Sequence, residues 1–209
     1  RGQDSLAVRI PSHPVARDLL KKINYPLLAP SANKSGGVSP TSPKHVRDDF
    51  KKLKGEKWEI AHILDFESCE IGIESTVIDC RKSKPKILRE GFITAEKIKN
   101  DLGINVYRNQ NSKDLISPGL MKKHYAPKTK VLINQKKYIE GSGCLFFGKI
   151  PSEFKECKFK YNLSISKNLF EASNLLYEGL RYLDEYNLKY IQVLPIPTLG
   201  IGKALNDRL

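Results

Sequence analysis

Residues 5–103 alternate between two apolar patterns, the two-residue period of strands and the longer period of amphipathic helices. Residues 5–11 alternate apolar and polar positions, whereas the helix pattern after His13-Pro14 puts Val15 and Leu19 on one face. Ser42-Pro43 and Thr94 are typical helix starts. In chain order we expect strands at residues 5–11, 26–29, 60–65, 75–78 and 86–89, and helices at residues 13–23, at 43–52 and from Thr94 onward.

The pattern changes at about Gly103, after which periodicity is lost until about Lys130. This basic segment is interpreted as a linker, and a second α/β unit follows it. We therefore expect a mixed α/β domain over residues 1–103, a linker over 104–129 and a smaller α/β domain over 130–209 built on a parallel sheet. The predicted elements of the second unit are strands near 130–134, 144–147, 158–163 and 190–195, with a long helix at about 167–186.

Composition narrows the classes of protein. The 209 residues carry a net charge of +13, which suits a polyanionic partner such as nucleotide or RNA, although a lysine-rich genome would give the same count. The four cysteines show no C-x-x-C pair, so a reduced cytosol is expected rather than a zinc site or a disulfide framework. No apolar run has the length of a membrane span, and the start Arg1-Gly2 is neither a signal peptide nor an initiator methionine. We expect no membrane partner.

The loop over residues 30–41 is the first candidate site. It leaves a predicted strand, enters a predicted helix and is rich in Ser, Thr, Asn and Gly. Small residues let backbone N–H groups and hydroxyls converge on an anion, and phosphate is the expected ligand. An ordinary polar crossover loop has the same composition, so composition alone leaves both readings open.

Two arginines and one short segment are further candidates. Arg9 lies inside a predicted strand and Arg89 at the end of another, where a guanidinium either pairs with an acid or binds a ligand carboxylate. Residues 117–127 bring two lysines, His124 and Tyr125 together, either as part of a lid or as a proline-bounded spacer. The Gly200-x-Gly202 pair is discounted as a dinucleotide fingerprint, because the third glycine and the distal acid are absent.

Several ordered motifs carry a family resemblance. They are Ala7-Val-Arg-Ile-Pro, Ala29-Pro-Ser-Ala-Asn-Lys-Ser-Gly, Ser39-Pro-Thr, Gly72-Ile-Glu-Ser-Thr-Val-Ile-Asp, Leu88-Arg-Glu-Gly, Ser117-Pro-Gly with His124-Tyr-Ala-Pro, and the final Gly-Ile-Gly-Lys-Ala-Leu-Asn-Asp-Arg. Together they resemble the YrdC-like family of threonylcarbamoyl-AMP synthases in its long two-domain form. The resemblance spans nearly the whole chain.

The resemblance implies a partial YrdC-like twisted mixed sheet domain, followed by a smaller Rossmann-like α/β domain. It implies condensation of L-threonine, bicarbonate and ATP into threonylcarbamoyl-AMP and pyrophosphate, the first step of threonylcarbamoyladenosine formation in tRNA. The implied partners beyond these substrates are double-stranded RNA or tRNA and the downstream threonylcarbamoyl transferase machinery, and Mg²⁺ is expected on the ATP phosphates. No residue is assigned covalent catalysis, since positioning and charge neutralisation suffice.

The resemblance also assigns site residues. Arg9 and Ser75 would hold threonine, and Ala29 would shape its pocket. The residues implied to serve ATP are Ser5, Ser31, Ser39 and Arg89, with Asn33 supporting the loop and Tyr125 closing over the nucleotide from the linker.

Two departures qualify this assignment. The family's Pro-Thr-Glu-Thr and Lys-x-Arg-Pro motifs have no counterpart, so the chain is interpreted as an N-terminally truncated fragment or split-gene product that lacks about half of the substrate cradle. Residues 65–69 carry Phe66 and Glu67 where the family has glycines, so we expect a different turn there. The rival hypotheses are a non-catalytic remnant that binds RNA or nucleotide, and a remnant that does not fold.

Overall fold

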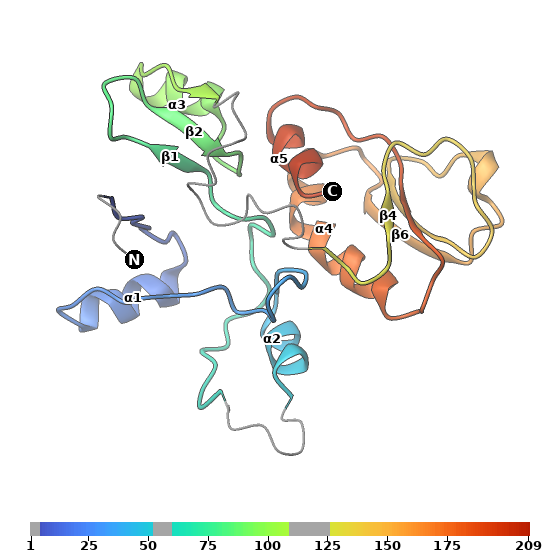
Figure 1. Ribbon diagram of the computed structural model, residues 1–209, viewed down its shortest axis with the longest axis horizontal. Helices are drawn as coiled ribbons and strands as arrows, with labels where there is room; N and C mark the ends of the chain where they lie inside the picture. The colour runs from blue at the N-terminus through green and yellow to red at the C-terminus, as the bar shows by residue number, and fades with distance from the viewer. Residues whose placement is uncertain (1–4, 52–59, 109–125) are drawn as a thin grey trace.

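The computed structural model describes residues 5–51, 60–108 and 126–209. Within these ranges the strands form two separate sheets, one of three strands and one of four. Figure 1 shows the smaller sheet in green and the larger one, with its helices, in yellow to red. The protein is an α/β protein, as the alternating patterns predict.

The first sheet joins β1 (Val77–Asp79), β2 (Lys86–Arg89) and β3 (Tyr107–Arg108). β1 and β2 are antiparallel, with Val77 opposite Arg89, and β2 and β3 are parallel, so the sheet is mixed. Helix α3 (Ala95–Leu102) lies between β2 and β3 in sequence. The predicted cap is confirmed, because the Thr94 side chain accepts a hydrogen bond from Lys97 N. β3 falls inside the segment predicted as linker, while the domain boundaries themselves stay a prediction.

The second sheet is parallel throughout, in the order β4-β7-β5-β6. Its strands are β4 (Val131–Leu132), β5 (Gly143–Phe147), β6 (Phe159–Ser164) and β7 (Ile191–Val193). The helical elements of this part are the short 3₁₀ helix η1 (Ser152–Phe154), α4 (Leu169–Asp184) and α5 (Ile201–Asp207). The predicted strands, the long helix and the parallel sheet are confirmed.

The inner strand β5 is buried on both faces. Leu145 and Phe147 face the main core with α4, whereas Cys144 and Phe146 face a smaller cluster with Phe154. A continuous apolar run is what a parallel strand covered on both sides requires. Because this core packs both faces of β5, the second sheet holds the residues described below in defined positions.

In residues 5–65 the predicted helices form, but the predicted strands do not. Helices α1 (Pro14–Lys22) and α2 (Pro43–Asp49) form as expected, and the predicted Ser42 cap is confirmed by its hydrogen bond from His45 N. The strands predicted at residues 5–11, 26–29 and 60–65 are wrong, since these segments are not assigned to strands. Alternation marks a segment suited to a sheet, but a strand also needs a hydrogen-bonded neighbour. Three apolar side chains of these segments are nearly fully exposed: Leu6 (82%), Ile10 (90%) and Leu28 (98%).

Two local features concern glycine. Glu67 has a φ of 51°, in the left-handed region, while the expected difference from the family's turn at residues 65–69 stays a prediction. The Gly200-x-Gly202 pair serves packing: Gly200 has a φ of 52° before α5, and a Cβ on Gly202 would collide with the Pro197 carbonyl. In the part of the chain that the structure describes, no helix is long and apolar enough to cross a membrane.

Candidate functional site

The loop over residues 30–41 is organised by Asn33. Its Nδ2 atom donates to the carbonyl oxygens of Lys34 (3.0 Å) and Gly37 (2.8 Å), which closes a turn around Gly36. The Asn33 Oδ1 atom is buried and has no hydrogen-bond partner within the described ranges. The Asn33 side chain therefore braces the turn from within, while Ser31 is exposed at the loop's start.

Arg89 and Ser75 are brought together at the first sheet. Arg89 is 8% exposed, and its Nε and Nη2 atoms donate to the Ser75 carbonyl oxygen at 3.2 and 3.0 Å. The Ser75 residue itself is exposed. A Cβ on Gly91 would meet the Glu74 carbonyl oxygen at 2.6 Å, so glycine allows the two backbone segments to approach. The strand end at Arg89 thus lies against the Gly72-Ile-Glu-Ser motif.

Glu74 is the centre of a buried polar cluster formed by Ser39, Glu74, Tyr177 and Arg208, which we call the Glu74 cluster. Ser39 Oγ donates to Glu74 Oε1 at 2.6 Å, and the Tyr177 hydroxyl lies 2.9 and 2.8 Å from the two carboxylate oxygens. Arg208 Nε donates to Glu74 Oε2 at 2.7 Å. The cluster joins the loop, the motif, α4 and the residue after α5.

The cluster keeps its carboxylate charged. Burial acts to raise the pKa of Glu74, but the Arg208 charge and the hydrogen bonds from Ser39, Arg208 and Tyr177 outweigh it, so the pKa lies below its ordinary value. Burial acts to lower the pKa of Arg208, and the neighbouring Glu74 carboxylate raises it overall. The pair is therefore an ion pair with each charge satisfied by its neighbours.

A second arginine, Arg181 of α4, binds the loop over residues 30–41. Arg181 Nε donates to the Ser39 carbonyl oxygen at 3.2 Å, and its Nη2 atom also donates to the Val38 carbonyl oxygen. The same guanidinium binds the Asp49 carboxylate at the end of α2. Ser39 is thus fixed through its side chain and its backbone.

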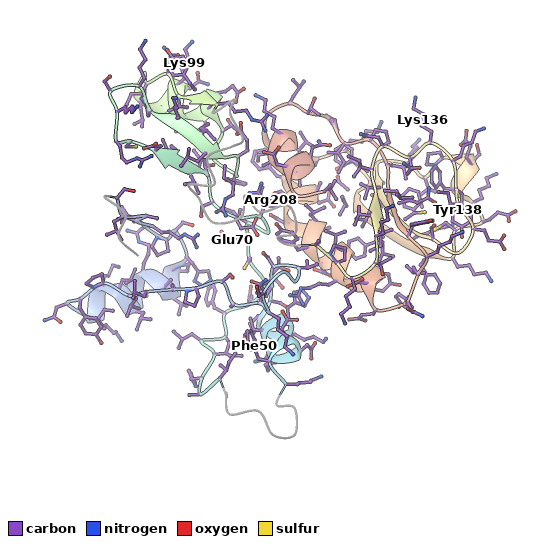
Figure 2. All side chains as sticks on the ribbon, viewed as in Figure 1. Phe50, Glu70, Lys99, Lys136, Tyr138 and Arg208 are labelled. Atoms are coloured by element: carbon purple, nitrogen blue, oxygen red, sulfur yellow. The ribbon has the colours of Figure 1, made fainter. Side chains whose placement is uncertain are left out.

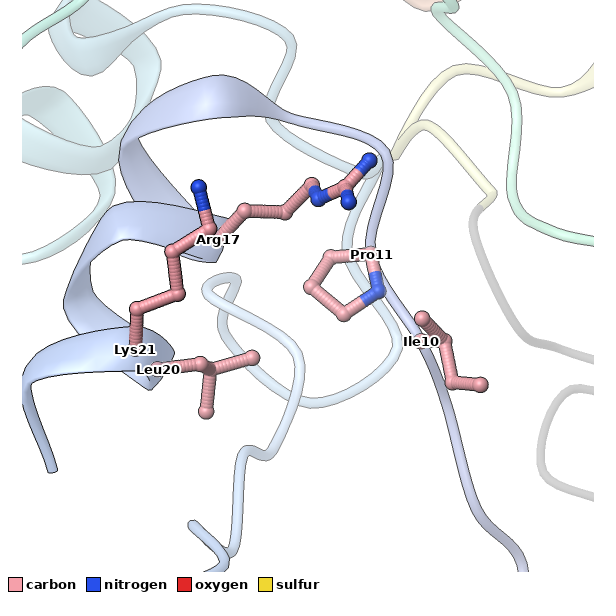
Figure 3. Close-up of a pocket in the computed structure, with 5 residues that line it drawn as sticks. All are labelled: Ile10, Pro11, Arg17, Leu20 and Lys21. Atoms are coloured by element: carbon pink, nitrogen blue, oxygen red, sulfur yellow. The ribbon is translucent and has the colours of Figure 1, made fainter. Parts of the chain in front are cut away.

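The remaining predicted residues are not brought into this group. Ser5, Arg9 and Ala29 are exposed, and within residues 5–51, 60–108 and 126–209 the Arg9 side chain forms no hydrogen bond or ion pair. Beside Arg9, residues 10–11 and α1 enclose a shallow hollow lined by Ile10, Pro11, Arg17, Leu20 and Lys21 (Figure 3). Tyr125 and most of the predicted lid lie outside the described residues.

Sequence reasoning missed Glu74, Tyr177, Arg181 and Arg208 as parts of the site. Glu74 and Arg208 stand inside quoted motifs, and an acid directly after the apolar Ile73 is a signal of a buried charge that needs a partner. The helical spacing of Tyr177 predicts only that it belongs to the apolar face of its helix. Their mutual contacts span more than a hundred positions, which no local pattern encodes.

Comparison with known proteins identifies the family of the chain. Residues 93–209, more than half of the chain, match the family model described as threonylcarbamoyl-AMP synthase, C-terminal domain. Residues 1–91 match a second family model, named for Sua5, yciO and yrdC and described as telomere recombination. The chain therefore belongs to the threonylcarbamoyl-AMP synthase family. Within that family it is of the two-domain Sua5 type, with both domains represented.

Relatives in three organisms match the whole chain. Threonylcarbamoyl-AMP synthase of Bacillus subtilis is 35% identical and that of Schizosaccharomyces pombe 34%, and the chain covers 63% and 57% of their lengths. The Pyrococcus abyssi protein is 32% identical, with 64% of its length covered. The crystal structure of P. abyssi Sua5 complexed with L-threonine matches with a TM-score of 0.81 at 30% identity, over 100% of this chain and 64% of that one. The chain thus spans less than two thirds of the length of these relatives.

Proposed function

We propose that the protein takes part in the synthesis of threonylcarbamoyl-AMP from L-threonine, bicarbonate and ATP, with release of pyrophosphate, for tRNA modification. One observation carries the proposal. Three motif segments that are far apart in sequence, around Ser39, Ser75 and Arg89, meet at the Glu74 cluster in a chain of this family. Carboxylated threonine attacks the α-phosphorus itself, so the chain's task is to position reactants and neutralise charge.

The roles of the residues follow from their chemistry. Arg9 is exposed without an acidic partner in the described structure, so its planar fork can bind the threonine carboxylate. Ser75 would contact threonine next to Ala29, and Arg89 would contact ATP with Ser5 and Ser31. Tyr125 would close over the nucleotide.

Ser39 has a more specific role. Its hydroxyl proton is donated to Glu74, so toward ATP the Ser39 oxygen acts as an acceptor. An acceptor suits a ribose hydroxyl or the adenine amino group rather than a phosphate oxygen. We therefore place Ser39 at the nucleoside end of ATP, and Asn33 below the loop that carries it.

Mg²⁺ would arrive on the ATP phosphates. In the described ranges no group of three His, Cys, Asp or Glu side chains is arranged to hold a metal ion. Mg²⁺ commonly binds through substrate phosphates with few protein ligands, so we expect the ion to enter the site with ATP. When bound, the ion neutralises phosphate charge, while the protein orients threonine and the nucleotide.

The finer architecture belongs to the same proposal. We assign residues 1–103 to the C-terminal part of a YrdC-like domain, residues 104–129 to a linker and lid, and residues 130–209 to a Rossmann-like domain. The downstream partners would be the threonylcarbamoyl transferase machinery and tRNA in the cytosol.

The test is an assay of pyrophosphate release by the intact gene product that contains this chain. Release should require both L-threonine and bicarbonate, and Arg89→Gln should abolish it, whereas Lys136→Gln at an exposed residue should not. Pyrophosphate release that ignores threonine would contradict the proposal. RNA affinity that falls steeply with salt, without any ATP turnover, would instead support the non-catalytic binding role.

A further inference from the structure

Arg208 contacts the neighbours of two proposed substrate-binding residues. Its Nε atom donates to Glu74, which precedes Ser75, and its Nη2 atom donates at 2.7 Å to the carbonyl oxygen of Glu90, which follows Arg89. One guanidinium therefore joins the threonine-binding motif to the nucleotide-binding strand end. Figure 2 shows Arg208 between the first sheet and the helices of the second.

The contact is largely buried. The Arg208 side chain is 3% exposed and that of Glu74 14% exposed, so both charges are mostly shielded from water. Charge-assisted hydrogen bonds in such surroundings are short, directional and costly to leave unmade. Tyr177 of α4 is fully buried and donates its hydroxyl proton to the same carboxylate.

The apolar core reinforces this attachment. Ile73, which precedes Glu74, and Val38, which precedes Ser39, are each 5% exposed and pack in the main core with Leu176 and Leu180 of α4. The two segments that carry Ser39 and Ser75 are thus anchored in the C-terminal domain, and their polar neighbours are oriented by Arg208.

We propose that Arg208 is a positioning residue for the synthase reaction, through which the C-terminal domain sets the relative placement of Ser75 and Arg89. This inference rests on the proposed function. In this role Arg208 acts through Glu74 and the Glu90 carbonyl, rather than by binding substrate itself. A displacement of about 1 Å between binding groups can cost about a hundredfold in rate, so a fork with two directed bonds is a sensitive control point.

The charge alone does not suffice for this role. Lysine could reach Glu74 or the Glu90 carbonyl, but it lacks the planar fork that binds both. Arg208→Lys should therefore fall between wild type and Arg208→Gln. A residue that only stabilises the fold would instead lower the melting temperature and leave the Michaelis constants of the folded fraction unchanged.

The experiment measures kcat and KM for threonine and ATP in the intact gene product, with hydrogen exchange of residues 72–76 and 89–91. Arg208→Gln should lower kcat/KM for threonine about 10- to 100-fold and speed exchange in both segments. The double variant Glu74→Gln/Arg208→Met removes both buried charges; it should regain melting temperature but not kcat/KM. Lys203→Gln, at the exposed ion pair of α5 with Glu96, is the matched control and should change kcat/KM less than about twofold.

The outcomes separate the two claims. An inactive wild type would overturn the proposed function, and the exchange data would still test Arg208. If wild type is active and Arg208→Gln retains its KM values and its exchange pattern, the positioning role is wrong. Recovery of both stability and kcat/KM in the double variant would also overturn it, since that result describes a purely structural ion pair.

Discussion

Arg181 of α4 binds Asp49 at the end of α2 through two bonds, Nη1 to Oδ1 at 2.9 Å and Nη2 to Oδ2 at 2.7 Å. The two side chains are 16% and 21% exposed, so the pair is largely shielded from water. Because Arg181 also binds the Val38 and Ser39 carbonyls, it fixes α2 and the loop before it to the C-terminal domain.

Arg181→Met should therefore destabilise the fold. We expect a loss of about 2 to 4 kcal/mol, because a shielded carboxylate and two carbonyl groups lose their partner together. Urea unfolding measures it. The control is Arg47→Met, which breaks the exposed Arg47–Asp65 pair and should cost less than about 1 kcal/mol. Equal losses in the two variants would show that Arg181 is only a surface cation.

The Glu74 cluster predicts a pH dependence of stability. The pKa of Glu74 in the folded state lies below its ordinary value of 4.5, so the charged cluster contributes stability above about that pH. The contribution is lost as the pH falls through the lowered pKa, because the unfolded state takes up the proton first. Unfolding free energies at about pH 7 and pH 3 should differ more in wild type than in Glu74→Gln. An unchanged difference would contradict the proposed ionisation.

Gly72 marks a close approach between the motif and α4. A Cβ there would meet the Ser173 carbonyl oxygen at 2.6 Å and collide with that of Asn174, and neither backbone group can move away cheaply. Gly72→Ala should cost about 1 to 3 kcal/mol through overpacking. Thermal unfolding checks this against Glu70→Ala, an exposed neighbour that should stay within about 0.5 kcal/mol of wild type.

Arg9 is expected to affect binding rather than stability. Arg9→Lys keeps the charge but loses the two-pronged contact, so threonine binding should weaken by about 1 to 3 kcal/mol with little change in melting temperature. Calorimetric titration of the intact gene product with threonine measures the affinity. A lower melting temperature with unchanged affinity would assign Arg9 a structural role.

Local signals predicted local structure well. Thr94 and Ser42 cap helices as their sequences indicate, and the strand at residues 86–89 has the predicted ends. The parallel second sheet follows from apolar runs separated by a long helix. The caps and strand ends depend on neighbours within a few residues, whereas the sheet pairs residues as distant as Val131 and Ile191 and follows from the alternation of strands and helices.

Partners distant in sequence were beyond prediction. Residues 5–11 alternate as a strand does, yet Leu6 and Ile10 are exposed, because alternation does not supply a neighbouring strand. The contact between Glu74 and Arg208 joins residues 134 positions apart, and no periodicity identifies such a pair. The candidate site was therefore predicted as a set of motifs, but not as the cluster that joins them.

The most direct test follows the carbon of bicarbonate. The intact gene product is incubated with ATP, L-threonine and ¹³C-bicarbonate, and the nucleotide products are analysed by mass spectrometry. We predict threonylcarbamoyl-AMP that carries the label, formed together with an equal amount of pyrophosphate and absent when threonine is omitted. Formation of ADP or AMP alone, without label and at the same rate with and without threonine, would contradict the account.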